Sequence, residues 1–125
     1  MALPVPITSA LHDALTFWLP LACAGCGDPD VSLCDGCRGD LTPRPSRQER
    51  DPGLSVVCGL PFEGVPARVI RAFKEEGRTA LARALAPALA AALAVSAPPG
   101  ARVTTVPSSR AAFRRRGYRP VEVLV

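Results

Sequence analysis

Residues 23–37 have the sequence CAGCGDPDVSLCDGC, which contains two Cys-x2-Cys pairs separated by seven residues. Two such pairs can place four thiolates around one tetrahedral metal ion, and zinc is the usual ion. Each pair needs a tight turn, and Gly25, Gly27 and Gly36 supply flexible backbone there. The spacing therefore predicts a compact zinc knuckle with four ligands: Cys23, Cys26, Cys34 and Cys37.

The predicted donor set limits what this site can do. Four thiolates around one Zn²⁺ leave a net negative charge, which a neighbouring cation such as Arg38 would reduce. A closed four-cysteine site has no open coordination position, so we expect a structural metal and not a catalytic one. Two disulfides or free thiols are the alternative. Cys58 stands alone and is expected to be a buried thiol and not a fifth ligand.

The compartment of the protein bears on this choice. No Lys or Arg precedes Arg38, Asp13 interrupts the apolar run, and Pro20 stands where a lipoprotein motif needs leucine. We therefore expect no secretory or lipoprotein signal. The longest uncharged stretch, residues 84–100, contains Pro87 and is mainly alanine, so we expect no membrane span. A cytoplasmic location follows, where reducing conditions favour metal ligation over disulfides.

The length fits one ordinary domain, or one small domain with part of another, and the order strand, loop, helix in the second half is that of an α/β unit. The 125 residues are 48% hydrophobic and 21% charged, which excludes a disordered acidic chain and a disulfide-dense toxin. Residues 1–20 have apolar residues near helical spacing and predict a short amphipathic helix. We expect two units: residues 1–53, with this helix, the zinc knuckle and a polar linker over 41–53, and residues 54–125.

The second unit is predicted to alternate strands and helices. Residues 54–58 predict a strand, residues 66–73 a helix, and Thr79 the N-cap of a second helix. Pro87 is expected to kink that helix. Residues 102–106 (RVTTV) predict a further strand, followed by a turn and a helix start near Pro120. Leucines at every fourth position of the second helix predict a core-facing stripe: Leu81, Leu85, Leu89 and Leu93.

Positive charge gathers toward the C-terminal end. The net charge is +4, and residues 101–125 contain six arginines against the single Glu122. A small-residue loop followed by Arg114, Arg115 and Arg116 suits a phosphate, because guanidinium groups and backbone N–H groups both bind that anion. These three arginines are therefore candidate anion-binding residues. A solvated basic face and nonspecific nucleic-acid binding are the alternatives.

The order of these features resembles the ComF family, which comprises phosphoribosyltransferase-like proteins linked to bacterial competence. The resemblance covers nearly the whole chain. It rests on the four-cysteine region, FEG at 62–64, VIRAFKEEGR at 69–78, an Ala/Leu helix, VTTVPSSR at 103–110 and RRRGY at 114–118. Where the family usually has Arg-Gly-Phe-Asn-Gln, this chain has RGYRP at 116–120, so the family's Asn and Gln are missing.

The resemblance implies the first part of a type I phosphoribosyltransferase fold in residues 54–125. In that fold a loop binds the pyrophosphate of phosphoribosyl pyrophosphate (PRPP), and the matching residues here are Val106, Pro107, Ser108, Ser109 and Arg110. The family's acidic pair, which grips the ribose phosphate, has no counterpart, because Glu122 is the one acidic residue after Val103. Mg²⁺ and PRPP are expected in full-length relatives, and this chain looks like a truncated member.

Three functions stay open at this point. The first is a phosphoribosyltransferase-family protein that is incomplete and inactive alone, so that its status as an enzyme is open. The second is a zinc-knuckle module that binds single-stranded DNA or a competence protein through its arginine-rich end. The third is a nonfunctional remnant of the first. The sequence identifies no catalytic residue and no acceptor substrate.

Overall fold

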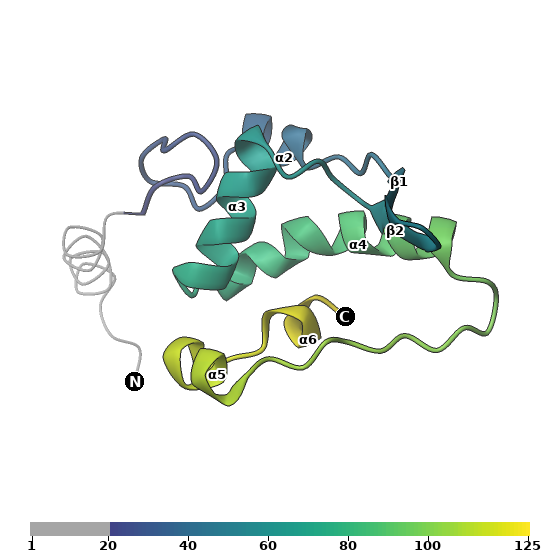
Figure 1. The fold of residues 1–125 in the computed structure, drawn as a ribbon. Coiled ribbons are helices and arrows are strands. Elements are labelled where there is room, and N and C mark those ends of the chain that lie inside the picture. The colour runs from purple at the N-terminus through teal and green to yellow at the C-terminus, as the bar shows by residue number, and fades with distance from the viewer. Residues whose placement is uncertain (1–20) are drawn as a thin grey trace, which may run out of the picture.

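The computed structural model describes residues 21–125, and the helix predicted over residues 1–20 lies outside this part. Figure 1 shows a long helix, α4, with α3 near its start, a two-stranded hairpin toward its end and the last two helices below it. Helix α4 contacts the hairpin and the last helix. The elements are α2 (Asp35–Asp40), β1 (Ser46–Asp51), β2 (Leu54–Cys58), α3 (Gly64–Glu75), the 3-10 helix η1 (Thr79–Leu81), α4 (Ala82–Ser96), α5 (Arg110–Arg116) and α6 (Pro120–Leu124). The mixed α/β class is confirmed, with a sheet of two strands.

The hairpin contains one strand that the sequence predicts and one that it does not. β2 occupies the predicted residues, and it pairs antiparallel with β1 from Ser46 opposite Cys58 to Asp51 opposite Leu54. The predicted polar linker over residues 41–53 therefore contains a strand, β1, that the sequence analysis did not expect. All residues of β1 are exposed, so no alternation of polar and apolar residues marks it in the sequence. The predicted unit boundary at residue 53 falls in the turn of this hairpin.

The hydrophobic core lies where α3 meets η1 and the first turns of α4. Phe73 and Val69 are fully buried on one face of α3, as their helical spacing requires. Leu81 and Leu85 are buried against them, whereas Leu89 and Leu93 are half-buried. The core-facing stripe is therefore confirmed for Leu81 and Leu85, whereas Ala88 and Ala92 are the buried residues of the later turns of α4. Two of the predicted ligands belong to the same buried cluster, Cys23 and Cys37.

The connection from α3 to α4 differs from the prediction. Thr79 is not the N-cap of α4; it is the first residue of η1, and α4 begins at Ala82. The reason is local, because the Thr79 N–H donates to the Gly77 carbonyl at 2.9 Å and the Leu81 N–H to the Arg78 carbonyl at 3.1 Å. These bonds form a tight turn before the helix starts. Pro87 lies inside α4.

The apolar character of α4 bears on the membrane question. Among the described residues, one helical segment, Thr79–Ser96, is long and apolar enough to cross a membrane. Core helices of soluble proteins share these properties, and Leu81, Leu85 and Ala88 are buried within the chain. The expected absence of a membrane span stays a prediction.

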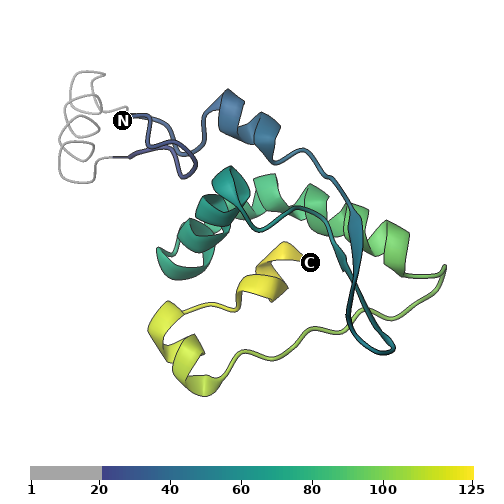
Figure 2. The ribbon, with the colours of Figure 1, turned by 45° about the horizontal axis from the view of Figure 1, so that its top comes forward.

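Residues 102–106 do not form the predicted strand. Figures 1 and 2 show residues 97–109 as an irregular connection that runs from the end of α4 back to α5. A strand needs a partner for its backbone groups, and in the described part of the chain β1 and β2 pair with each other. Val103 and Val106 are exposed as a result. The helix predicted to start near Pro120 is confirmed as α6, with Pro120 in its first turn.

Candidate metal centre

The structure brings the four predicted cysteines together. Their sulfur atoms all lie within 4.8 Å of one another. With Zn–S bonds of about 2.3 Å, sulfur atoms at the corners of a tetrahedron would be about 3.8 Å apart. The Sγ atoms of Cys26 and Cys34 are 3.7 Å apart, close to that spacing and well beyond the length of a disulfide bond. All described cysteines are free thiols, so the disulfide alternative is absent from this structure.

Two local structures hold these sulfur atoms. Cys34 is the N-cap of α2, and its Sγ accepts a hydrogen bond from the backbone N–H of Cys37 at 3.5 Å. The other pair lies in a turn, where the Gly27 N–H donates to the Cys23 carbonyl at 2.9 Å. The Cys34 N–H donates to Cys23 Sγ at 3.3 Å and thereby joins the two pairs. Backbone donors of this kind stabilise a thiolate, which is the form that binds a metal.

The surroundings give the thiols different pKa values. Burial raises the pKa of Cys23, but backbone N–H groups of the knuckle outweigh this effect and lower that pKa to about 6. For Cys26, the backbone of Asp28 acts to lower the pKa, yet burial and the thiols of Cys23 and Cys34 raise it. Burial and the neighbouring thiols also raise the pKa of Cys37. Four thiols this close cannot all ionise unless a cation compensates their charge, which a bound metal ion does.

The three glycines of the knuckle have different roles. A Cβ atom at Gly25 would lie 2.4 Å from Cys37 Sγ, so the space there is open to glycine alone. Gly27 has a φ of 87°, a backbone conformation that favours glycine. A Cβ atom at Gly36 would meet nothing within 4 Å. The prediction that these glycines supply flexible backbone for tight turns therefore holds for Gly27, and Gly25 is required by close packing instead.

Two arginines contact the knuckle that no sequence pattern marks as part of the site. Arg78 donates to the carbonyls of Ala22 and Ser32, and Arg68 donates to the carbonyl of Gly25. These partners are separated by more than 40 positions along the chain, and no motif links them. A hydrogen bond from a side chain to a distant backbone carbonyl cannot be predicted from a single sequence.

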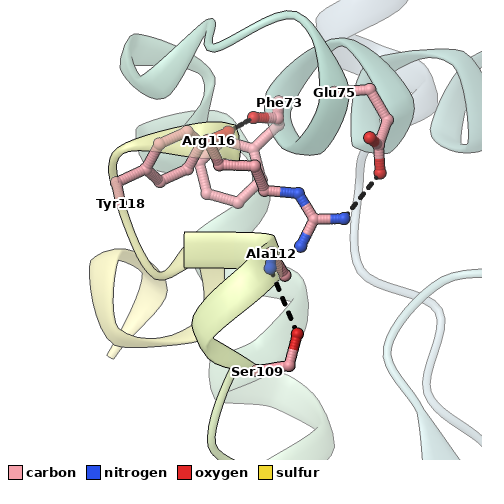
Figure 3. Close-up of polar contacts among 6 residues, drawn as sticks. All are labelled: Phe73, Glu75, Ser109, Ala112, Arg116 and Tyr118. Carbon is pink, nitrogen blue, oxygen red and sulfur yellow. Dashed lines mark hydrogen bonds and ion pairs between the residues drawn. The ribbon is translucent and has the colours of Figure 1, made fainter. Parts of the chain in front are cut away.

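The candidate anion-binding arginines lie in the last turn of α5, and their surroundings differ. Arg116 forms an ion pair with Glu75 of α3 at 2.8 Å, and its side chain is 15% exposed. Arg114 and Arg115 are exposed. Figure 3 shows Arg116 extended from α5 toward Glu75, so this residue attaches α5 to α3.

A tyrosine strengthens the same attachment. The Tyr118 hydroxyl donates to the carbonyl of Phe73 (Figure 3). The centroids of the Phe73 and Tyr118 rings lie 6.0 Å apart. Burial is the main reason why the pKa of Tyr118 is raised. The segment RGYRP at 116–120 therefore makes structural contacts through Arg116 and Tyr118.

The candidate pyrophosphate loop has no regular structure before α5. Val106, Pro107, Ser108 and Ser109 belong to the irregular connection, and Arg110 is the first residue of α5. Ser109 is the N-cap of that helix, because its Oγ accepts a hydrogen bond from the Ala112 N–H at 3.1 Å (Figure 3). Val106 is 87% exposed. The loop thus presents backbone and small side chains to solvent, and the Ser109 hydroxyl is already hydrogen-bonded to the Ala112 N–H.

Cys58 lies outside the four-cysteine group. It is half-buried at the end of β2 and lines an apolar hollow of about 370 Å³ between β2, α3, α4 and α6. The prediction that Cys58 is not a fifth ligand agrees with this position, whereas the predicted burial of its thiol is only partial.

Comparison with family models, with curated proteins and with solved structures finds no match to this chain. The four clustered cysteines are therefore the functional feature that the structure itself supports, as a group that could hold a metal ion such as zinc.

Gly25→Ala is expected to weaken metal binding at least tenfold, because its methyl group would displace the Cys37 sulfur atom. Gly36→Ala is the matched control, since the same methyl group meets open space on α2. Metal content by elemental analysis and affinity by chelator competition measure the effect. Equal affinity in the two variants would contradict the observed packing at Gly25.

Proposed function

We propose that this chain is a zinc-knuckle protein related to the ComF family, in which residues 21–41, the knuckle module, hold one structural zinc ion. The observation that carries this proposal is the approach of four sulfur atoms to within 4.8 Å of one another. Four thiolates form a closed donor set that zinc favours and that leaves no position for a substrate. The role of the metal is therefore to fold the module, in a cytoplasmic, reducing compartment.

We extend the proposal to residues 54–125, which we assign to a phosphoribosyltransferase-like unit that is inactive in this chain alone. The order of motifs supports the assignment, from the four cysteines to the arginine-rich end. Residues 106–110 supply one candidate contact, for the pyrophosphate end of PRPP. After them the chain has the single acidic residue Glu122, so no acidic pair is available to hold the ribose or Mg²⁺.

A second candidate function is binding of single-stranded DNA or an anionic partner through the arginine-rich end. The exposure of Arg110, Arg114 and Arg115 on α5 favours it, because guanidinium groups in solvent are accessible to phosphate. Arg116 does not contribute to this candidate surface, since it is paired with Glu75.

The chain purified under reducing conditions is expected to carry one zinc ion, measured by elemental analysis. Structural zinc contributes on the order of 10 kcal/mol to the folding of a small module. Chelation should therefore unfold residues 21–41, while α4 keeps most of its helical circular-dichroism signal through its contacts with β2 and α6. Cys34→Ser should lose the metal and Cys58→Ser should keep it. A metal content well below one per chain would refute the zinc centre.

No phosphoribosyl transfer is expected from this chain with PRPP, Mg²⁺ and a panel of nucleobases. Holding both reactants in position can lower a barrier by about 7–11 kcal/mol, and this chain provides contacts for one end of PRPP only. Pyrophosphate release measures the reaction, with a complete phosphoribosyltransferase as the positive control. Sustained turnover that depends on the chain would show that other residues hold the ribose phosphate.

For single-stranded DNA, the double change Arg114→Ala/Arg115→Ala is expected to reduce the dependence of affinity on salt. Each phosphate contact contributes roughly 0.7 to the slope of log affinity against log salt, so the slope should fall by roughly 1.4. The control Arg47→Ala/Arg50→Ala removes the same charge from exposed β1. Equal slopes for both variants would mean that the arginines of α5 form only a solvated face.

A further inference from the structure

We propose that Arg78 and Arg68 are positioning residues that couple metal binding in the knuckle module to its attachment on α3; this inference rests on the proposed zinc centre. Both arginines come from the part of the chain that carries the core helices. Both donate to backbone carbonyls of the module and not to sulfur atoms. They therefore act on the metal through the positions of its ligands.

Arg78 fixes the distance between the two cysteine pairs. Its guanidinium group donates to the carbonyl of Ala22 at 2.9 Å and to the carbonyl of Ser32 at 2.8 Å. Ala22 immediately precedes Cys23, and Ser32 lies two residues before Cys34. The Arg78 side chain therefore links the two backbone segments that lead into the two cysteine pairs.

The Ser32 carbonyl is the point where these contacts meet. It also accepts a hydrogen bond from the Ala24 N–H at 3.0 Å, inside the first cysteine pair. The Ser32 hydroxyl lies 3.2 Å from the Arg78 guanidinium as well. Arg78 is half-buried there, at the junction between α3 and η1. All three contacts come from one guanidinium nitrogen of Arg78, so a lysine ammonium that reached the same place could make some of them.

Arg68 makes a similar contact with the first cysteine pair. Its Nε donates to the carbonyl of Gly25, the residue whose close packing on Cys37 leaves no room for a side chain. Gly25 immediately precedes Cys26. Arg68 therefore orients the turn of the first pair, while Arg78 spans both pairs.

The charge of the knuckle module gives a second reason why metal binding should strengthen its contacts with Arg68 and Arg78. Residues 21–41 contain four aspartates and the single Arg38. Four thiolates around a divalent cation add net negative charge to the module, and the guanidinium groups of Arg68 and Arg78 lie against it. Their attraction is strongest when all four thiolates are present, so attachment and metal loading should favour each other.

An arginine that positions metal ligands and an arginine that only stabilises the fold have different thermodynamic effects. If metal binding strengthens the contacts of Arg78 by a given factor, then removal of Arg78 must lower the metal affinity by the same factor. A merely structural arginine would stabilise the chain equally with and without metal. The stability of both forms therefore has to be measured.

The experiment measures zinc affinity by chelator competition and thermal unfolding with and without zinc for the full chain. Loss of a group that orients metal ligands typically costs 10–100-fold in affinity, and we expect this range for Arg78→Ala. Arg78→Lys should recover part of the loss. Arg68→Ala should have a smaller effect, because it makes one contact. The spectrum of the cobalt-substituted protein should be unchanged, since the four sulfur ligands remain.

Arg71→Ala is the matched control, because Arg71 is an exposed arginine of α3 that lies over the Phe62 ring. We expect the loss of unfolding temperature in Arg78→Ala to appear in the zinc-loaded form and to be absent without zinc. Wild-type zinc affinity in Arg78→Ala, or equal destabilisation of both forms, would overturn the inference alone. A wild-type chain that binds no zinc would overturn the proposed centre as well.

Discussion

Four sulfur atoms lie at the edge of the hydrophobic core, and much of the structure depends on keeping them there. Cys23 and Cys37 are buried in the same cluster as Val69 and Phe73. A thiolate can be buried only when hydrogen bonds or a cation compensate its charge. The backbone donors to Cys23 and Cys34 supply part of this compensation, and a bound metal ion would supply the rest. Two cysteines of the four-sulfur group are therefore packed into the hydrophobic core.

Helix α3 contacts both the knuckle module and the arginine-rich end. At one side Arg68 bonds to the knuckle module, and near its C-terminal end Glu75 pairs with Arg116 of α5. The Phe73 carbonyl accepts the Tyr118 hydroxyl, while the Phe73 ring fills the core. α3 is thus the element through which the knuckle module and the arginine-rich end are held in one molecule.

The arginine-rich end combines structural and exposed charges. Arg116 pairs with Glu75, and Arg119 pairs with Glu122 and lies over the Phe113 ring. Ion pairs in solvent contribute little to stability, so the half-buried pair of Arg116 matters more for attachment than that of Arg119. The remaining arginines of α5 point their charge to solvent. Nearby apolar side chains are also exposed: Val103, Val106, Val121, Val123 and Val125.

The sequence by itself determined the features that depend on neighbouring residues. Two Cys-x2-Cys pairs predict the four-sulfur group, β-branched residues predict β2, and the leucine spacing predicts the buried face of α4, because each pattern reflects local geometry. Features that need a distant partner were decided by the tertiary structure. β1 forms because it pairs with β2, and residues 102–106 stay irregular because no partner strand lies beside them in the described part of the chain. Arg116, a candidate anion-binding residue, forms an ion pair with Glu75 instead. Arg78 reaches Ala22 across 56 positions, because folding alone brings that carbonyl within its hydrogen-bonding distance.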